Sequence, residues 1–110
     1  MLIAEHDGLV AGYGSLGDFR PFEGYRLTVE HSLYVGAEYR GKGLRTALLA
    51  ALIDEATRLG KRNMVGGIDG GNEVSLALHR RLGFIERGRL PGIGVKFDHF
   101  LDLVLLQKNL

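Results

Sequence analysis

The chain has 110 residues, 45% of them hydrophobic, which suits one globular domain over residues 1–110 and excludes intrinsic disorder. A formal net charge of +1 excludes a global field for nucleic acid or membranes, and the absence of cysteine excludes disulfides and thiolate nucleophiles. With scattered histidines, no leader pattern and no long apolar run, we expect a cytoplasmic protein without a metal site.

Two apolar runs open the chain, Met1 to Glu5 and Leu9 to Leu16, and the His6-Asp7-Gly8 segment between them predicts a β-hairpin. Aromatic residues interleave with glycine and proline over Gly17 to Arg26, which indicates an ordered loop. Leu27 to Val35 alternates with the period of a strand. We expect one face to carry Val29, Leu33 and Val35, and the other Thr28, Glu30, Ser32 and Tyr34.

Two helices are predicted by the spacing of apolar residues. The first runs from Leu44 to Leu59 and stops at Gly60, and its apolar run Ala47 to Ala51 indicates that it is largely buried. The second runs from Glu73 to Leu82, with Asn72 as its N-cap.

Three further strands are expected, at Met64 to Ile68, Phe84 to Leu90 and Leu101 to Gln107, with a glycine-rich loop between the last two. The order strand, strand, strand, helix, strand, helix, strand, strand predicts an α/β (α+β) fold. We expect a mixed, mostly antiparallel sheet with helices packed on it.

Glycines and cations combine between the third strand and the first helix, in Glu38-Tyr39-Arg40-Gly41-Lys42-Gly43-Leu44-Arg45. Glycines let backbone N–H groups approach a ligand, and a helix N-terminus favours an anion, so a diphosphate is the natural partner. The alternative is a glycine-permitted turn with solvated charges. No Gly-Lys-Ser/Thr ends the loop, and Thr46 occupies the third position of a dinucleotide fingerprint, so ATP hydrolysis and dinucleotide binding lose support.

Together with Asn72-x-x-Ser75 and Leu78-His79-Arg80-Arg81-Leu82-Gly83-Phe84, the loop resembles the GNAT superfamily of acetyl-CoA-dependent N-acetyltransferases. Four further segments make the chain most similar to the phosphinothricin and methionine sulfoximine acetyltransferase branch of this superfamily: Phe19-Arg20-Pro21, Thr28-Val29-Glu30-His31-Ser32, Gly94-x-Lys96-Phe97 and Leu101-Asp102-Leu103. The resemblance covers essentially the whole chain.

The resemblance implies that acetyl-CoA lies in a cleft between splayed strands, Leu27 to Val35 and Met64 to Ile68. Its pantetheine would pair with the backbone from Leu33 to Val35, and its diphosphate would bind amides from Arg40 to Arg45. The implied contacts are Leu33, Tyr34, Val35, Arg40, Gly41, Lys42, Gly43, Leu44, Arg45 and Asn72.

Two features depart from the family pattern. Glu38 stands where glutamine or arginine is usual, and Arg45 stands where a small residue is often found. The family also normally begins with a strand and two helices that are missing before Met1. We expect a homodimer, since a second chain could cover the apolar sheet surface that these helices would leave exposed.

Acetyl transfer to an amine needs a neutral amine, a stabilised oxyanion and a proton for the thiolate. Glu30 lies in a largely apolar strand, where a carboxylate is costly unless it is paired or faces a wet cleft. The resemblance favours Glu30 as the base; the alternative is a structural pair with Arg26, four residues away on the same face.

His79 follows Asn72 by seven residues, where many family members place a tyrosine near the thioester sulfur. We expect it to be either the general acid or a packing residue of the second helix. Asn72 is expected to cap that helix and to contact the cofactor. Arg20 and Arg26 beside the aromatic loop are candidates for binding an acceptor carboxylate, or else are solvated surface charges.

The leading hypothesis is an acetyl-CoA-dependent N-acetyltransferase for a small, amino-acid-like amine, using acetyl-CoA as co-substrate and no metal. The alternative is a non-catalytic acyl-CoA-binding or interaction module. A nucleotide-binding protein that uses Gly41 to Gly43 is the third.

Overall fold

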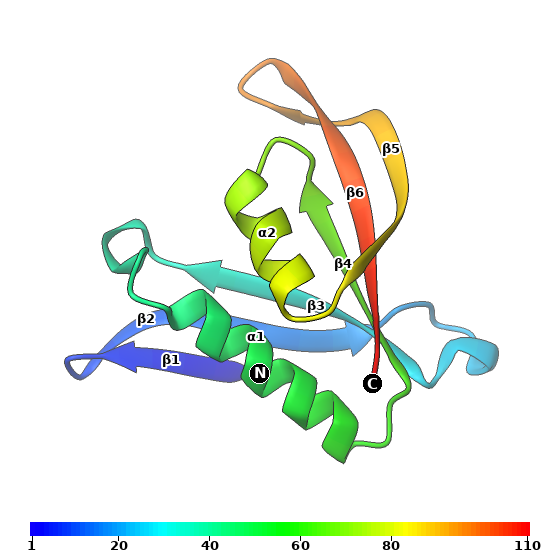
Figure 1. Ribbon diagram of the computed structural model, residues 1–110, viewed down its shortest axis with the longest axis horizontal. Helices are drawn as coiled ribbons and strands as arrows, with labels where there is room; N and C mark the ends of the chain where they lie inside the picture. The colour runs from blue at the N-terminus through cyan, green and yellow to red at the C-terminus, as the bar shows by residue number, and fades with distance from the viewer. The chain divides into compact units, whose positions relative to one another are not determined.

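The computed structural model describes residues 1–110 as six strands and two helices (Figure 1). The order of strands and helices predicted from the sequence is confirmed. The chain forms two units, one of residues 1–64 with Leu110 and one of residues 65–109.

The first unit contains an antiparallel meander of β1 (Leu2–His6), β2 (Leu9–Asp18) and β3 (Thr28–Val35). Asp7-Gly8 joins the first two strands with positive φ at both residues, 53° and 79°, which is the conformation that a tight hairpin turn requires. The connection between β2 and β3 includes the short 3₁₀ helix η1 (Glu23–Tyr25). The loop predicted from Gly17 therefore begins two residues later, because Gly17 and Asp18 pair with β3.

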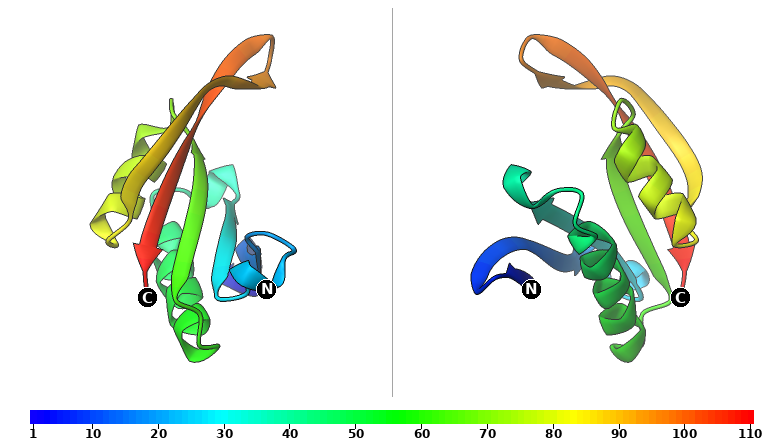
Figure 2. Two further views of the ribbon diagram at one scale, coloured as in Figure 1. Left: turned by 90° about the vertical axis from the view of Figure 1, so that its right-hand side faces the viewer. Right: turned by 60° about the vertical axis from the view of Figure 1, so that its left-hand side comes forward.

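Helix α1 (Leu44–Arg58) follows the 3₁₀ helix η2 (Ala37–Tyr39) and covers one face of this meander (Figure 2). The alternation predicted for β3 is confirmed, since Val29 and Val35 are buried. The expectation of a largely buried helix is wrong, because one side of α1 faces solvent, and Ala47 and Ala51 are both exposed. The buried helix residues are Leu48, Leu49, Leu52 and Ala56.

The second unit has the strand order β4-β6-β5, with α2 (Glu73–Arg81) beside the strands (Figure 1). Strand β4 (Asn63–Asp69) begins with the last two residues of the first unit, while β5 (Ile85–Lys96) and β6 (His99–Asn109) form an antiparallel hairpin. The buried apolar residues here are Leu76, Leu78, Phe84, Val104 and Leu106.

The glycine-rich loop expected between the last two strands is wrong. Strand β5 continues through that segment, and β5 and β6 form one long hairpin whose turn is Phe97-Asp98 (Figure 2). The register shifts between Leu90 and Gly94, where three residues of β5 lie opposite Asp102 as a bulge. Pro91 and Gly92 are common in loops, so the sequence predicts a loop here. The pairing of this segment with β6 depends on the tertiary structure and cannot be predicted from local sequence.

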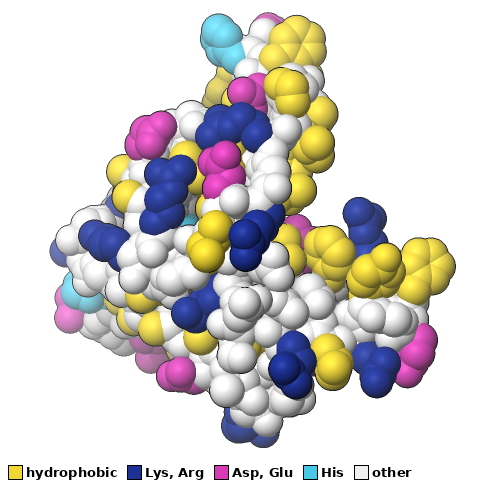
Figure 3. Space-filling view, turned by 45° about the vertical axis from the view of Figure 1, so that its right-hand side comes forward, with side chains coloured by type: hydrophobic (Ala, Val, Ile, Leu, Met, Phe, Trp, Pro, Cys, Tyr) yellow, Lys and Arg dark blue, Asp and Glu magenta, His cyan; other side chains and the backbone are white.

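Hydrophobic side chains gather along this hairpin on the face seen in Figure 3. The exposed large hydrophobic residues of β5, β6 and their turn are Ile85, Leu90, Ile93, Val95, Phe97 and Phe100. Neither helix of the chain is long and apolar enough to cross a membrane.

Candidate active site

Two glycines shape the loop before α1. Gly41 and Gly43 have φ of +81° and +78°, in the left-handed region. A Cβ at either position would meet no atom within 4 Å. The backbone angle, and not a lack of space, therefore explains glycine at both positions.

The N-terminus of α1 offers a row of backbone donors. No N–H group from Gly41 to Thr46 donates a hydrogen bond within the chain, and the first helical bond runs from the Ala47 N–H to the Gly43 carbonyl, 3.1 Å apart. Gly43 is the N-cap and has no side chain to accept from these donors, and the first turn carries no acidic residue. Free N–H groups at the positive end of a helix dipole suit phosphate oxygens.

Three cations predicted for this loop take different positions. The Nε of Arg40 donates to the Val35 carbonyl at 3.4 Å, so this side chain ties the loop to the end of β3. Lys42 is exposed and Arg45 is half-buried in the first turn of α1. Lys42 and Arg45 are therefore the charges left for an anion at the loop, together with the amides of Gly41 to Leu44.

The end of β3 is fixed by its pairing with β2. Leu33, Tyr34 and Val35 lie opposite Gly14, Tyr13 and Gly12. The Tyr34 ring lies on the exposed face against Tyr13, with ring centroids 5.6 Å apart, while Val35 is buried. This segment therefore has an ordered backbone that leads directly into the glycine loop.

Glu30 lies on the exposed face of β3, away from the face that α1 covers. Its carboxylate has no ion pair, so the alternative of a structural pair with Arg26 is wrong. Arg26 is held by Glu23 instead, with Nε 3.7 Å from the carboxylate and Nη1 donating to the Glu23 carbonyl at 3.3 Å. The predicted alternation holds for Glu30, which lies on the face opposite to Val29 and Val35 and is exposed.

The aromatic loop holds the other arginine predicted for the acceptor. The guanidinium of Arg20 lies over the Phe19 ring, 5.1 Å from its centroid, and Phe19 contacts Tyr25 edge to face. Both Arg20 and Arg26 are exposed on the same connection between β2 and β3. Each is therefore held by its own loop and open to solvent.

Asn72 and His79 belong to the second unit. The Asn72 side chain accepts from the Ser75 N–H at 3.1 Å, which confirms the predicted N-cap of α2. His79 is buried, its Nδ1–H donates to the Ser75 carbonyl at 2.7 Å, and Phe84 lies edge-on to its ring. Burial lowers the pKa of His79, and the bond to the Ser75 carbonyl opposes this only in part. These contacts support the packing role, and the general-acid role stays a prediction.

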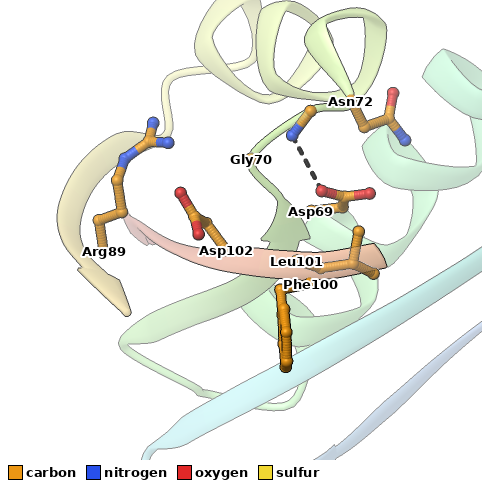
Figure 4. A pocket seen from close by; sticks show the side chains of 8 residues that line it. Asp69, Gly70, Asn72, Arg89, Phe100, Leu101 and Asp102 are labelled. Carbon is orange, nitrogen blue, oxygen red and sulfur yellow. Dashed lines mark hydrogen bonds between the residues drawn. The ribbon is translucent and has the colours of Figure 1, made fainter. Parts of the chain in front are cut away.

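A hollow of about 640 Å³ in the second unit was not predicted from the sequence. Its charged lining residues are Asp69, Asp102 and Arg89, and Figure 4 shows the Asp102 carboxylate on the side of the hollow where Arg89 lies. Asp69 accepts from the Gly71 N–H at 2.9 Å, and Asp102 accepts from Gly92 at the same distance. No spacing rule brings these residues together, because they come from β4, β5 and β6.

The sequence profile of the Acetyltransferase (GNAT) family matches residues 1–84. The chain belongs to this family. Among relatives of this GNAT chain, an L-methionine sulfoximine/L-methionine sulfone acetyltransferase from Salmonella typhimurium is 50% identical over 110 residues, 100% of this chain. The L-amino acid N-acyltransferase MnaT from Escherichia coli is 49% identical, again over 100% of this chain. The GNAT chain spans 64% of the length of each of these relatives.

Solved GNAT structures agree with this assignment. A phosphinothricin acetyltransferase from Sinorhizobium meliloti, crystallised in complex with acetyl-CoA, superposes with a TM-score of 0.94 at 40% identity. The alignment covers 98% of this GNAT chain and 59% of that structure. The resemblance to the phosphinothricin and methionine sulfoximine branch is thereby confirmed.

Proposed function

We propose that the protein is an acetyl-CoA-dependent N-acetyltransferase that acetylates the amine of a small, amino-acid-like acceptor. The row of free N–H groups from Gly41 to Thr46 is the observation that carries this proposal. Backbone N–H groups left free at the N-terminus of a helix suit the oxygens of a diphosphate, which coenzyme A contains. The names of relatives that act on L-methionine sulfoximine and on L-amino acids support the acceptor class.

Acetyl-CoA would supply an acetyl group activated as a thioester, and the chain's own residues would position it. The amides of Gly41 to Leu44, with Lys42 and Arg45, would bind the diphosphate. Arg40 would act indirectly, since its bond to the Val35 carbonyl holds the loop against β3. The proposed remaining contacts are the backbone of Leu33, Tyr34 and Val35, and Asn72.

Glu30 would accept the proton of the acceptor amine, directly or through a water molecule. Its position on the open face of β3, without an ion pair, leaves the carboxylate free to receive that proton. Arg20 and Arg26, both on the exposed loop that precedes β3, would bind an acceptor carboxylate. Burial of His79 favours its neutral form, which has no proton to spare for the thiolate at Nδ1 while that proton is donated to Ser75. The proposed general-acid role of His79 therefore has less support than the proposed base role of Glu30.

An acetylation assay tests the proposed function. The protein is incubated with acetyl-CoA and single acceptors: L-methionine sulfoximine, L-methionine sulfone, phosphinothricin, L-methionine and simple amines. We expect thiol release matched by formation of the N-acetyl product with at least one amino-acid-like acceptor. Saturable binding of CoA without turnover on any acceptor would identify the non-catalytic acyl-CoA-binding module instead.

Several narrower expectations stay predictions. They are a single domain over residues 1–110, the splayed cleft for acetyl-CoA, a cytoplasmic location and the absence of a metal. A homodimer also stays a prediction, and light scattering at micromolar concentration measures it.

A further inference from the structure

Gly17 lies directly opposite Glu30 in the pairing of β2 with β3. Residues opposite each other in an antiparallel pair project to the same face, with Cβ atoms about 4.5–5.5 Å apart. Any side chain at position 17 would therefore stand beside the Glu30 carboxylate. With glycine there, that side of the carboxylate is uncovered.

No structural requirement explains glycine at position 17. The backbone of Gly17 is outside the left-handed region, and an added Cβ would meet no atom within 4 Å. Two other glycines of β2 differ: a Cβ at Gly12 would overlap the Tyr34 carbonyl oxygen, and a Cβ at Gly14 would lie 2.8 Å from Cδ1 of Leu52. Packing thus explains Gly12 and Gly14 but not Gly17, where an exposed strand position would be more stable with a larger residue.

We infer that Gly17 is an access residue, which keeps Glu30 open to the amine of the acceptor. This inference rests on the proposed function and adds a determinant of acceptor size beside the candidate base. A branched side chain at position 17 would occupy the space that the amine must enter to reach Glu30. The glycine loop that would bind the diphosphate is formed by other residues of the unit, so acetyl-CoA affinity should not change.

Kinetics of Gly17→Ala and Gly17→Val test the inference. We expect kcat/KM for the acceptor to fall progressively with side-chain size, by about ten-fold or more for valine, because displacement of a reactant from its attack geometry has effects of this order. The Kd for acetyl-CoA should stay unchanged, and the melting temperature should be maintained or raised. Gly88→Val is the matched control, since Gly88 is a strand glycine of β5 whose added Cβ would have its nearest neighbour at 4.0 Å.

Chemical labelling gives a readout that needs no turnover. A water-soluble carbodiimide with glycine ethyl ester as the amine modifies accessible carboxylates, and peptide mass spectrometry compares Glu30 with the exposed Glu23 as internal reference. We expect the ratio of Glu30 to Glu23 labelling to fall several-fold in Gly17→Val and to stay at the parent's value in Gly88→Val.

The outcomes separate this inference from the proposed function. Full kcat/KM in a folded Gly17→Val, or an unchanged labelling ratio, would overturn the access role while leaving the N-acetyltransferase assignment intact. A parent protein that transfers acetyl to no acceptor would overturn the proposed function and the acceptor role of Gly17 with it. If Gly17→Val does not fold, Gly17→Ala supplies both readouts.

Discussion

Glu30 is the residue at which binding and chemistry should separate. Glu30→Gln keeps the shape of the side chain and removes the base, so we expect kcat to fall by roughly 10²-fold while the Kd for acetyl-CoA stays nearly unchanged. Because Glu30 is exposed and unpaired, the free energy of unfolding should change by less than about 0.5 kcal/mol. On one preparation, a thiol-release assay measures kcat, calorimetry measures the Kd for acetyl-CoA, and urea unfolding measures the free energy of unfolding.

Glu5→Gln is the control for that substitution, since Glu5 is an exposed strand carboxylate of the same unit. It should leave kcat at the parent's value. Full turnover in Glu30→Gln would remove Glu30 from the catalytic assignment, whatever the value of the acetyl-CoA affinity.

His79 should make stability depend on pH. Its pKa is lowered in the folded protein by burial, so between the ordinary value of 6.5 and the lower folded value the unfolded chain binds more protons. The stability contribution of neutral His79 is therefore complete above about pH 6.5 and is lost as the pH falls towards the folded pKa. We expect urea midpoints to decrease over this acidic range, and His79→Gln to remove part of the decrease.

The exposed His99 provides the matched control. His99→Gln should retain the decrease seen in the parent. An identical acidic slope in the parent and in His79→Gln would contradict the assignment of this slope to His79.

At the scale of elements, the two ends of α1 allow a paired test. Gly43 at the N-terminus and Gly60 after the C-terminus have φ of +78° and +79°, and an added Cβ at either would meet nothing within 4 Å. Valine at either position should lower the free energy of unfolding by about 1–2 kcal/mol, because a Cβ is strained in this backbone region. Only Gly43→Val should also weaken acetyl-CoA binding, since its side chain would crowd the row of amides that begins α1.

Isothermal titration calorimetry and urea unfolding on the two variants measure these effects. Gly60→Val measures the effect of backbone strain alone. Any additional loss of acetyl-CoA affinity in Gly43→Val is therefore caused by the change in the glycine loop. Equal acetyl-CoA affinities in the two variants would exclude the glycine loop from the binding site.

At the scale of the whole molecule, the ligand should stabilise the fold. A ligand that binds only the folded chain adds about 2.7 kcal/mol of stability at a concentration 100 times its Kd. We expect acetyl-CoA and CoA to raise the melting temperature in differential scanning fluorimetry. ATP should not displace CoA in a competition titration, because it lacks pantetheine; displacement by ATP at similar concentration would support the nucleotide-binding alternative.

The sequence by itself determined the order of the elements and several of their ends. Alternation predicted which side of β3 is buried, Asn72 predicted the N-cap of α2, and Gly60 predicted the end of α1; the structure confirms each. The glycine loop was likewise predictable, because its residues are contiguous and their conformational needs are local. Motif spacing also indicated the family that the comparisons then showed.

Only the tertiary structure decided which residues meet across strands. Pairing with β6 turned the expected loop around Gly92 into a bulged strand, and the register of β2 with β3 placed Gly17 opposite Glu30. These outcomes depend on strand register, which a one-residue shift would change entirely and which local sequence patterns do not specify.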